Sequence, residues 1–111
     1  MATTFNSAQV QLSTTSETDV YQAPNTSGNT AVVMSILVAN VNGTASADVT
    51  ISKTNSSNTL QSYLAYTIPV PNDTSLEVVA TRIVLKQGEK IRATASSANY
   101  LHVTVSALEN T

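Results

Sequence analysis

The sequence has no cysteine and no tryptophan, and it has few charged, glycine and proline residues. Without cysteine, disulfides, thiolate metal sites and cysteine nucleophiles are excluded, and thiol usage says nothing about the redox compartment. Charged residues make up 11% of the chain, where about 25% is usual. The formal net charge of -2 provides no general attraction to nucleic acid, so we expect no nucleic-acid partner.

The sequence also lacks a long apolar run. The longest one, residues 31–39, is interrupted by Ser35 and is far shorter than the roughly 20 residues of a membrane-spanning helix. The first fifteen residues contain no basic region followed by an apolar one, so no secretory signal is expected. We therefore expect no membrane partner and one domain, large enough to bury about two thirds of the surface of the unfolded chain.

The sequence is rich in Thr, Ser, Asn and Val, with 17, 14, 10 and 13 residues. Its apolar residues are mostly β-branched and alternate with polar ones at a period of two, which predicts strands and not helices. We predict an all-β fold, an antiparallel two-sheet β-sandwich of about eight strands. The number of strands favours a jelly-roll-like strand order over an immunoglobulin-like one. A closed β-barrel is a further alternative. Residues 1–18 are expected to form a polar N-terminal arm, and residues 19–111 the sandwich.

Two predicted strands have clear core faces. In residues 47–52 one face is apolar and the other polar, so one side should meet water. In the last strand, residues 100–108, alternate apolar side chains should also face the core. The predicted core residues of the two strands are Ala47, Val49 and Ile51, and Leu101, Val103, Val105 and Ala107.

The strand predicted for residues 30–40 is apolar on both faces. One parity contains Val32, Met34, Ile36 and Val38, and the other contains Ala31, Val33, Ser35, Leu37 and Ala39. One face should fill the core, and a loop, the N-terminal arm or another chain should cover the other. Val33 and Leu37, or Met34 and Ile36, are therefore candidate interface residues.

Two hairpins are predicted from turn signals. Asn42-Gly43-Thr44 should join the strand of residues 30–40 to that of residues 47–52, because Asn-Gly is a strong hairpin signal. Gln87-Gly88-Glu89 should join residues 81–86 to residues 90–96. Pro69 and Pro71 should end the strand of residues 61–68 or place its end at a sheet edge.

No arrangement of residues predicts catalysis. The titratable inventory is His102 with three Asp and four Glu residues at wide spacing, without a nucleophile elbow or a calcium loop. His102 occupies an outward position, which is typical of a solvated surface. We expect no enzyme activity, no cofactor and no metal site.

Four of the five basic residues fall within eleven positions, on what we expect to be the outer face of the second hairpin: Arg82, Lys86, Lys90 and Arg92. This cluster could dock on an acidic protein surface. It could equally be a solvated face whose lysines discourage edge pairing. Outward Ser and Thr residues suit contact with a neighbouring subunit, since a buried hydroxyl costs less than a buried ion.

The chain resembles a small structural domain recurrent in virion proteins of tailed bacteriophages, especially marine and cyanobacterial phages. Glu89 stands where that family often has Asp in its hairpin. The resemblance covers residues 20–109, and its landmarks are Val20-Tyr21-Gln22-Ala23-Pro24, Ala31-Val32-Val33-Met34, Leu37-Val38-Ala39-Asn40-Val41, Ala47-Asp48-Val49-Thr50-Ile51, Tyr63-Leu64-Ala65, Ile68-Pro69-Val70-Pro71, Leu85-Lys86-Gln87-Gly88-Glu89-Lys90-Ile91 and Val103-Thr104-Val105-Ser106-Ala107-Leu108-Glu109.

The resemblance implies a non-enzymatic virion component that assembles in the cytoplasm of a bacterial host. A chain of 111 residues with its own Met1 favours a capsid decoration (cement) protein, a homo-oligomer in contact with the major capsid protein or other virion proteins. The alternative is a tail, collar or fibre module that binds a host glycan. Tyr21, Tyr63, Tyr66 and Tyr100 are not clustered in the sequence, which disfavours a stacking site for sugars. A host β-sandwich domain unconnected with phage is a third possibility.

Overall fold

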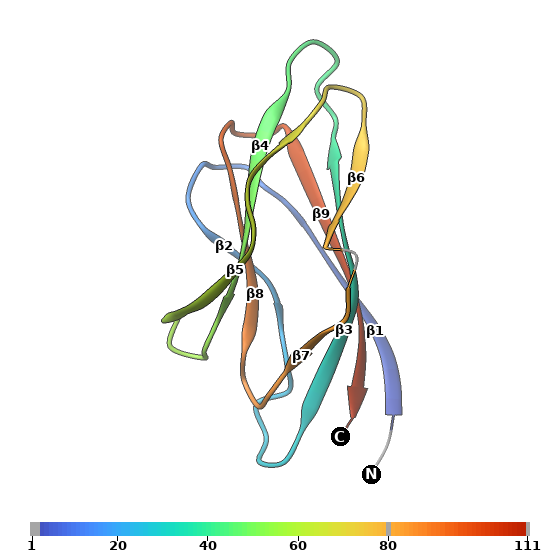
Figure 1. Ribbon diagram of the computed structural model, residues 1–111, viewed down its shortest axis with the longest axis vertical. Coiled ribbons are helices and arrows are strands. Elements are labelled where there is room, and N and C mark those ends of the chain that lie inside the picture. The colour runs from blue at the N-terminus through green and yellow to red at the C-terminus, as the bar shows by residue number, and fades with distance from the viewer. Residues whose placement is uncertain (1–2, 80, 111) are drawn as a thin grey trace.

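Two antiparallel sheets pack face to face in the computed structural model, which describes residues 3–79 and 81–110 (Figure 1). Sheet A has the strand order β1-β9-β3-β6, and β7 also pairs with β3; sheet B has the order β2-β8-β4-β5. The strands of sheet A are β1 (Thr3–Gln11), β3 (Thr30–Asn40), β6 (Ser75–Val79), β7 (Ile83–Leu85) and β9 (Leu101–Asn110). Those of sheet B are β2 (Thr18–Gln22), β4 (Ala47–Thr54), β5 (Leu60–Val70) and β8 (Lys90–Ala95). The predicted β-sandwich is confirmed.

The core lies between the sheets and is built from alternate residues of each strand, as the pleat of a β-strand requires. All the core residues predicted in β4 and β9 are buried. Leu12, just after β1, is also fully buried, and its N–H donates to the carbonyl of Leu101 at 2.9 Å. The described residues contain no helix that is long and apolar enough to cross a bilayer.

β3 changes its facing halfway along. Its register with β9 shifts between Val33 and Ser35, which marks a bulge, and a bulge moves the following side chains to the opposite parity. Ala31 and Val33 face the core before the bulge, and Ile36 and Val38 face it afterwards. The predicted division of β3 into two regular faces is therefore wrong: the bulge explains much of its apolar character on both parities.

Both predicted hairpins are wrong in their pairing. β3 lies in sheet A and β4 in sheet B, so the turn at Asn42 and Gly43 connects the two sheets. β7 and β8 are likewise in different sheets, and the turn at Gly88 joins them. Ala47, Val49 and Ile51 of β4, predicted to face inward, do contribute to the core, because two strands can share a core from opposite sheets as well as from one.

The N-terminal segment is not a separate arm over its described part. Thr3–Gln11 forms β1, which pairs with β9 in a continuous antiparallel register. Its residues are mostly exposed because β1 is an edge strand, while Ala8 and Val10 pack against the core. The start of β1 and the end of β9 lie at the same end of the molecule, where Thr3 pairs with Asn110 (Figure 1). The edge strand β5 contains Pro69, as the edge placement predicted for this proline requires.

Candidate interaction surfaces

The outer face of sheet A carries exposed apolar side chains. Strand pairing places Phe5 beside Leu108 and Val84 beside Val32 on this face, and Leu37 beside Thr104. Phe5, Val84 and Leu37 are 76%, 58% and 40% exposed. Few titratable side chains lie on the outer face of sheet A. This face can therefore make apolar contacts but has few groups for acid–base catalysis.

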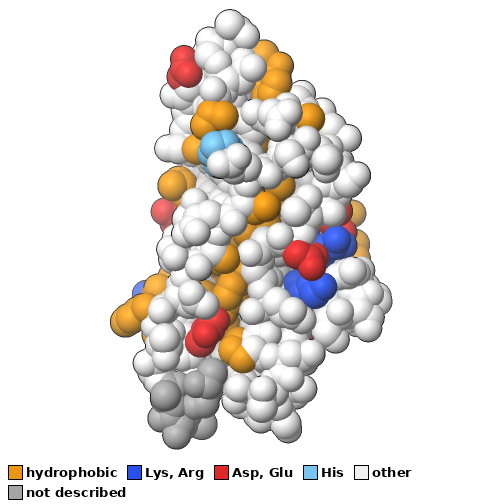
Figure 2. Space-filling view, turned by 180° about the vertical axis from the view of Figure 1, so that it is seen from behind, with side chains coloured by type: hydrophobic (Ala, Val, Ile, Leu, Met, Phe, Trp, Pro, Cys, Tyr) orange, Lys and Arg blue, Asp and Glu red, His pale blue; other side chains and the backbone are white. Residues whose placement is uncertain are grey.

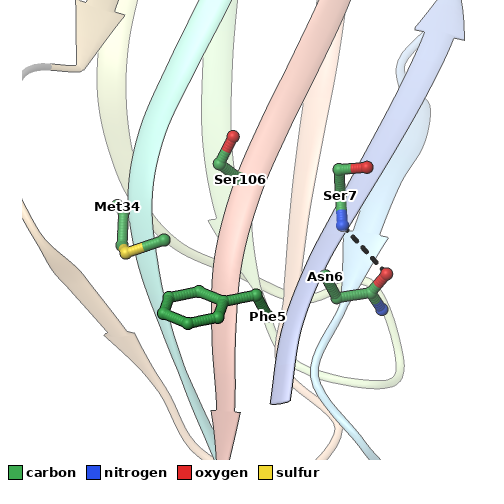
Figure 3. A pocket seen from close by; sticks show the side chains of 5 residues that line it. All are labelled: Phe5, Asn6, Ser7, Met34 and Ser106. Carbon is green, nitrogen blue, oxygen red and sulfur yellow. Dashed lines mark hydrogen bonds between the residues drawn. The ribbon is translucent and has the colours of Figure 1, made fainter.

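A shallow hollow of about 420 Å³ lies on this face, lined by Phe5, Asn6, Ser7, Met34 and Ser106 (Figure 3). The ring of Phe5 extends from β1 across β9 toward the side chain of Met34 on β3. The Ser7 N–H donates to Asn6 Oδ1 at 2.9 Å. Phe5 and Met34 give the hollow an apolar part, and Asn6, Ser7 and Ser106 give it uncharged polar groups.

The predicted interface residues of β3 separate into two groups. Val33 and Ile36 are fully buried in the core. Met34 is half-buried and lines the hollow on the outer face of sheet A, and Leu37 is exposed. Leu37 is 40% exposed in the single chain, so neither a loop nor the N-terminal segment covers it among the described residues, and its cover by another chain stays a prediction.

The basic cluster is also divided. Lys90 and Arg92 lie on β8 in sheet B, where the Lys90 Nζ is 3.0 Å from Asp19 Oδ2 and the Arg92 Nε donates to Asp19 Oδ1 at 2.5 Å. The Arg92 Nη1 forms a second ion pair with Glu17 Oε1 at 2.5 Å. Partial burial would by itself raise the pKa of Asp19, but the hydrogen bonds and charges of Lys90 and Arg92 outweigh it and hold that pKa below its ordinary value.

Arg82 and Lys86 are exposed at the two ends of β7, which belongs to sheet A. The four basic residues therefore do not share the outer face of one hairpin, and that prediction is wrong. The face seen in Figure 2 is mostly uncharged, and the basic side chains at its right-hand side adjoin acidic ones. An apolar strip runs along its long axis.

Glu89 closes the turn between β7 and β8. It accepts hydrogen bonds from the Lys86 N–H at 2.8 Å and from Gln61 Nε2 at 2.9 Å, and its Oε1 is 3.1 Å from Lys53 Nζ. Burial of the carboxylate opposes ionisation, but these donors and the Lys53 charge lower the pKa of Glu89 overall. Glu89 is thus a structural acid that holds a turn to β4 and β5.

Glu109 joins the two sheets at the β1 edge. Its Oε2 accepts a hydrogen bond from Tyr21 Oη of sheet B at 2.5 Å and another from Asn6 Nδ2 of β1 at 3.1 Å. Burial of the phenol, followed by its hydrogen bond to Glu109, raises the pKa of Tyr21. Tyr21 therefore stays protonated and acts as a donor.

His102 faces outward on β9, beside Gln11 and Ala39 of the neighbouring strands. It borders a second hollow of about 270 Å³, lined also by Gln9, Val10 and Thr104 among others. Among residues 3–79 and 81–110, no three or more His, Asp or Glu side chains gather closely enough to hold a metal ion.

Two tyrosines that are apart in the sequence meet on the edge strand β5. The ring centroids of Tyr63 and Tyr66 are 4.8 Å apart at an interplanar angle of 65°, and the side chains are 51% and 61% exposed. In a regular strand, residues three apart would point to opposite faces. The register of β5 against β4 is irregular, and this irregularity brings them together.

Phe5 and Val84 are the residues of the outer face of sheet A that sequence reasoning missed. Phe5 lies in the segment predicted as a polar arm, and Val84 lies in a strand of the second predicted hairpin. The alternation of Phe5, Ser7 and Gln9 with Ala8 and Val10 was a usable signal for a longer strand. If this alternation is continued back to residue 5, Phe5 falls on the strand face that points away from the core.

No known protein family and no curated protein sequence matches the chain. A chain from the structure described as the acidic stable capsid structure of Helicobacter pylori bacteriophage KHP30 has a similar fold, with a TM-score of 0.56 and 12% sequence identity. The match covers 98% of this chain and 87% of that chain. It shows that the two chains share a fold over nearly their whole lengths.

Proposed function

We propose that this chain is a non-enzymatic structural protein of a bacteriophage virion, and specifically a capsid decoration (cement) protein on the outside of the head. The observation that carries the proposal is the likeness of fold to a chain of a phage capsid structure over 98% of the chain. The resemblance of residues 20–109 to phage virion domains points to the same class, although no family model matches the chain.

The surface chemistry of the sandwich suits such a role. The outer face of sheet A offers Met34, Leu37 and Val84 for apolar contact with the shell or with a second subunit. Arg82 and Lys86 are exposed for contact with acidic groups of the shell, whereas Lys90 and Arg92 are held by Asp19 and Glu17. A protein that binds only the assembled shell stabilises it by mass action.

The first test is the position and copy number of the chain in phage particles that carry it, measured by cryo-electron microscopy and quantitative mass spectrometry. We expect hundreds of copies on the outside of the head. A handful of copies at one vertex would contradict decoration and support a tail or collar position.

The second test measures binding to undecorated capsids. Leu37→Lys places a charge on the outer face of sheet A. Thr94→Lys places a lysine on β8 of sheet B and serves as the control. We expect Leu37→Lys to weaken binding at least tenfold, about 1.4 kcal/mol, and Thr94→Lys to leave it within about twofold. Equal effects of the two changes would argue against contact through sheet A.

The second candidate function is a tail, collar or fibre module that binds a host glycan. The exposed Tyr63 and Tyr66 pair favours it, because aromatic faces stack on sugar rings. Glycan-array binding that is lost in Tyr63→Ala and Tyr66→Ala, without loss of thermal stability, would favour this function over decoration.

A further inference from the structure

β1 is a long and unprotected sheet edge. It lies at the end of the sheet A order and pairs on one side with β9 across all nine of its residues, without a register shift. Thr3–Gln11 contains no charged residue and no proline. Natural proteins use such residues and bulges to prevent edge pairing, so β1 lacks the usual protection.

The other sheet edges among the described residues are each protected. β5 has three register shifts against β4, contains Pro69 and has a positive φ of 48° at Thr67. β2 has five residues, a register shift and the ion-paired Asp19. The far edge of sheet A is divided between β6 and β7, of five and three residues. β1 is therefore exceptional among the edges.

The odd-numbered residues of β1 direct their backbone groups away from β9. The Leu12 N–H donates to the Leu101 carbonyl at 2.9 Å, in the same register as β1 and β9. Because antiparallel ladders alternate, the N–H groups of Phe5, Ser7 and Gln9 point to the open edge. The Ser7 N–H at this edge donates to Asn6 Oδ1 of its own chain at 2.9 Å (Figure 3). Pairing with a second strand would replace this local hydrogen bond.

We propose that two copies of this chain associate by antiparallel pairing of β1 with β1 about a two-fold axis at Ser7. In this register Ser7 faces its own symmetry mate, and Phe5 faces Gln9 of the second copy. All nine residues of β1 then pair over about 30 Å. Odd residues meet odd residues, so the outward backbone groups match and the two five-stranded sheets become one.

The charge of the edge favours a second copy as the occupant. A two-fold axis pairs the strand with itself, so a charge on the axis would oppose its own copy and a charge near the axis would lie close to its copy, and like charges directly opposite each other destabilise a strand pair. β1 avoids this cost because it has no charge. Pairing also covers Phe5, which is 76% exposed in the single chain, with the aliphatic part of Gln9. The inference concerns the isolated chain and does not rest on the proposed function.

Cysteine cross-linking tests the register, and the absence of native cysteine leaves no background. Ser7→Cys would place two Cα atoms about 5.5 Å apart, within the disulfide range of about 4.4 to 6.8 Å. Gln9→Cys would leave its two Cα atoms about 13 Å apart. Under mild oxidation we expect the Ser7→Cys dimer to form at least tenfold faster. Equal rates would overturn the proposed register.

Sedimentation velocity over a concentration series tests the association itself. We expect the wild-type chain to form dimers, Ser7→Lys to raise the dissociation constant about fivefold or more because two lysines oppose each other, and Ser57→Lys in the exposed β4–β5 loop to leave it unchanged. A wild-type chain that stays monomeric would overturn the proposal and leave the edge to a strand of another protein. Equal association of wild type and Ser7→Lys would also overturn it.

Discussion

Asn40 shows how one polar residue can stabilise an apolar sandwich from inside. It is 3% exposed at the end of β3. Its Nδ2 donates to the carbonyls of Val70 at 2.9 Å and Ala45 at 3.1 Å, and its Oδ1 accepts the Asn42 N–H at 2.8 Å. The side chain thereby connects β3 of sheet A with the end of β5 in sheet B and with the β3–β4 turn.

Asn40→Ala should lower the free energy of unfolding by about 2–4 kcal/mol, because it removes three hydrogen bonds and leaves buried backbone groups without partners. Urea denaturation followed by circular dichroism measures this change. Asn110→Ala, at an exposed end of β9, is the control and should change stability by less than about 0.5 kcal/mol. A loss no larger than that of the control would mean that water replaces the amide.

At the scale of elements, turns and bulges decide how the strands are distributed between the sheets. The turn from β7 to β8 crosses from sheet A to sheet B, and Gly88 adopts a φ of 73° within it. A Cβ at this position would lie 2.6 Å from Asn25 Oδ1 and 3.3 Å from Ser56 Cβ. Gly28 has a similar φ of 84°, but a Cβ there would meet nothing within 4 Å.

The two glycines form a matched pair for mutation. Gly28→Ala should cost about 1–2 kcal/mol, the penalty for a left-handed backbone in an L-residue. Gly88→Ala should cost about 1 kcal/mol more, because the Asn25 side chain must move as well. Thermal and urea unfolding of both variants measures the difference, and equal losses would show that Asn25 moves without cost.

At the scale of the whole molecule, the charged residues are few, and several of them form ion pairs with one another. Glu17 and Asp19 pair with Lys90 and Arg92 in sheet B, and Glu89 pairs with Lys53 near the β7–β8 turn. The pKa values of Asp19 and Glu89 lie below their ordinary values of 3.8 and 4.5. Folding therefore favours the ionised carboxylates.

This arrangement predicts stability that declines in acid. Above pH 4.5, the higher ordinary value, both carboxylates are ionised in the folded chain and their contribution is nearly complete. As the pH falls further, the unfolded chain binds protons first, so the free energy of unfolding decreases until the folded carboxylates also protonate. Urea denaturation between about pH 7 and pH 2.5 should show this decline.

The double variant Asp19→Asn, Glu89→Gln provides the control. It should be less stable than the wild type at neutral pH, where the ion pairs operate, and its stability should decline less steeply in acid. Parallel declines for the two proteins would assign the acid sensitivity to other carboxylates. High salt should reduce the difference between them, because Asp19 is partly exposed.

The sequence by itself determined the all-β class, the approximate positions of most strands, and the core faces of β4 and β9, whereas the structure has nine strands where about eight were predicted. Periodicity is local, and a buried strand face must be apolar wherever the strand lies. The same alternation predicted an outward His102. The missing N–H of proline predicted that Pro69 would end its strand or lie at a sheet edge, and it lies in the edge strand β5. Strand pairing, the bulge in β3 and the separation of Lys90 and Arg92 from Arg82 and Lys86 were decided only by the tertiary structure.

The physical reason is that an apolar alternation records which residues are buried but not against which strand they pack. β3 and β4 share one core from opposite sheets and satisfy the same pattern as a hairpin would. A bulge shifts the parity of β3 without changing its composition. The open edge of β1 and the meeting of Tyr63 with Tyr66 likewise depend on which strands pair, and pairing is settled by long-range packing.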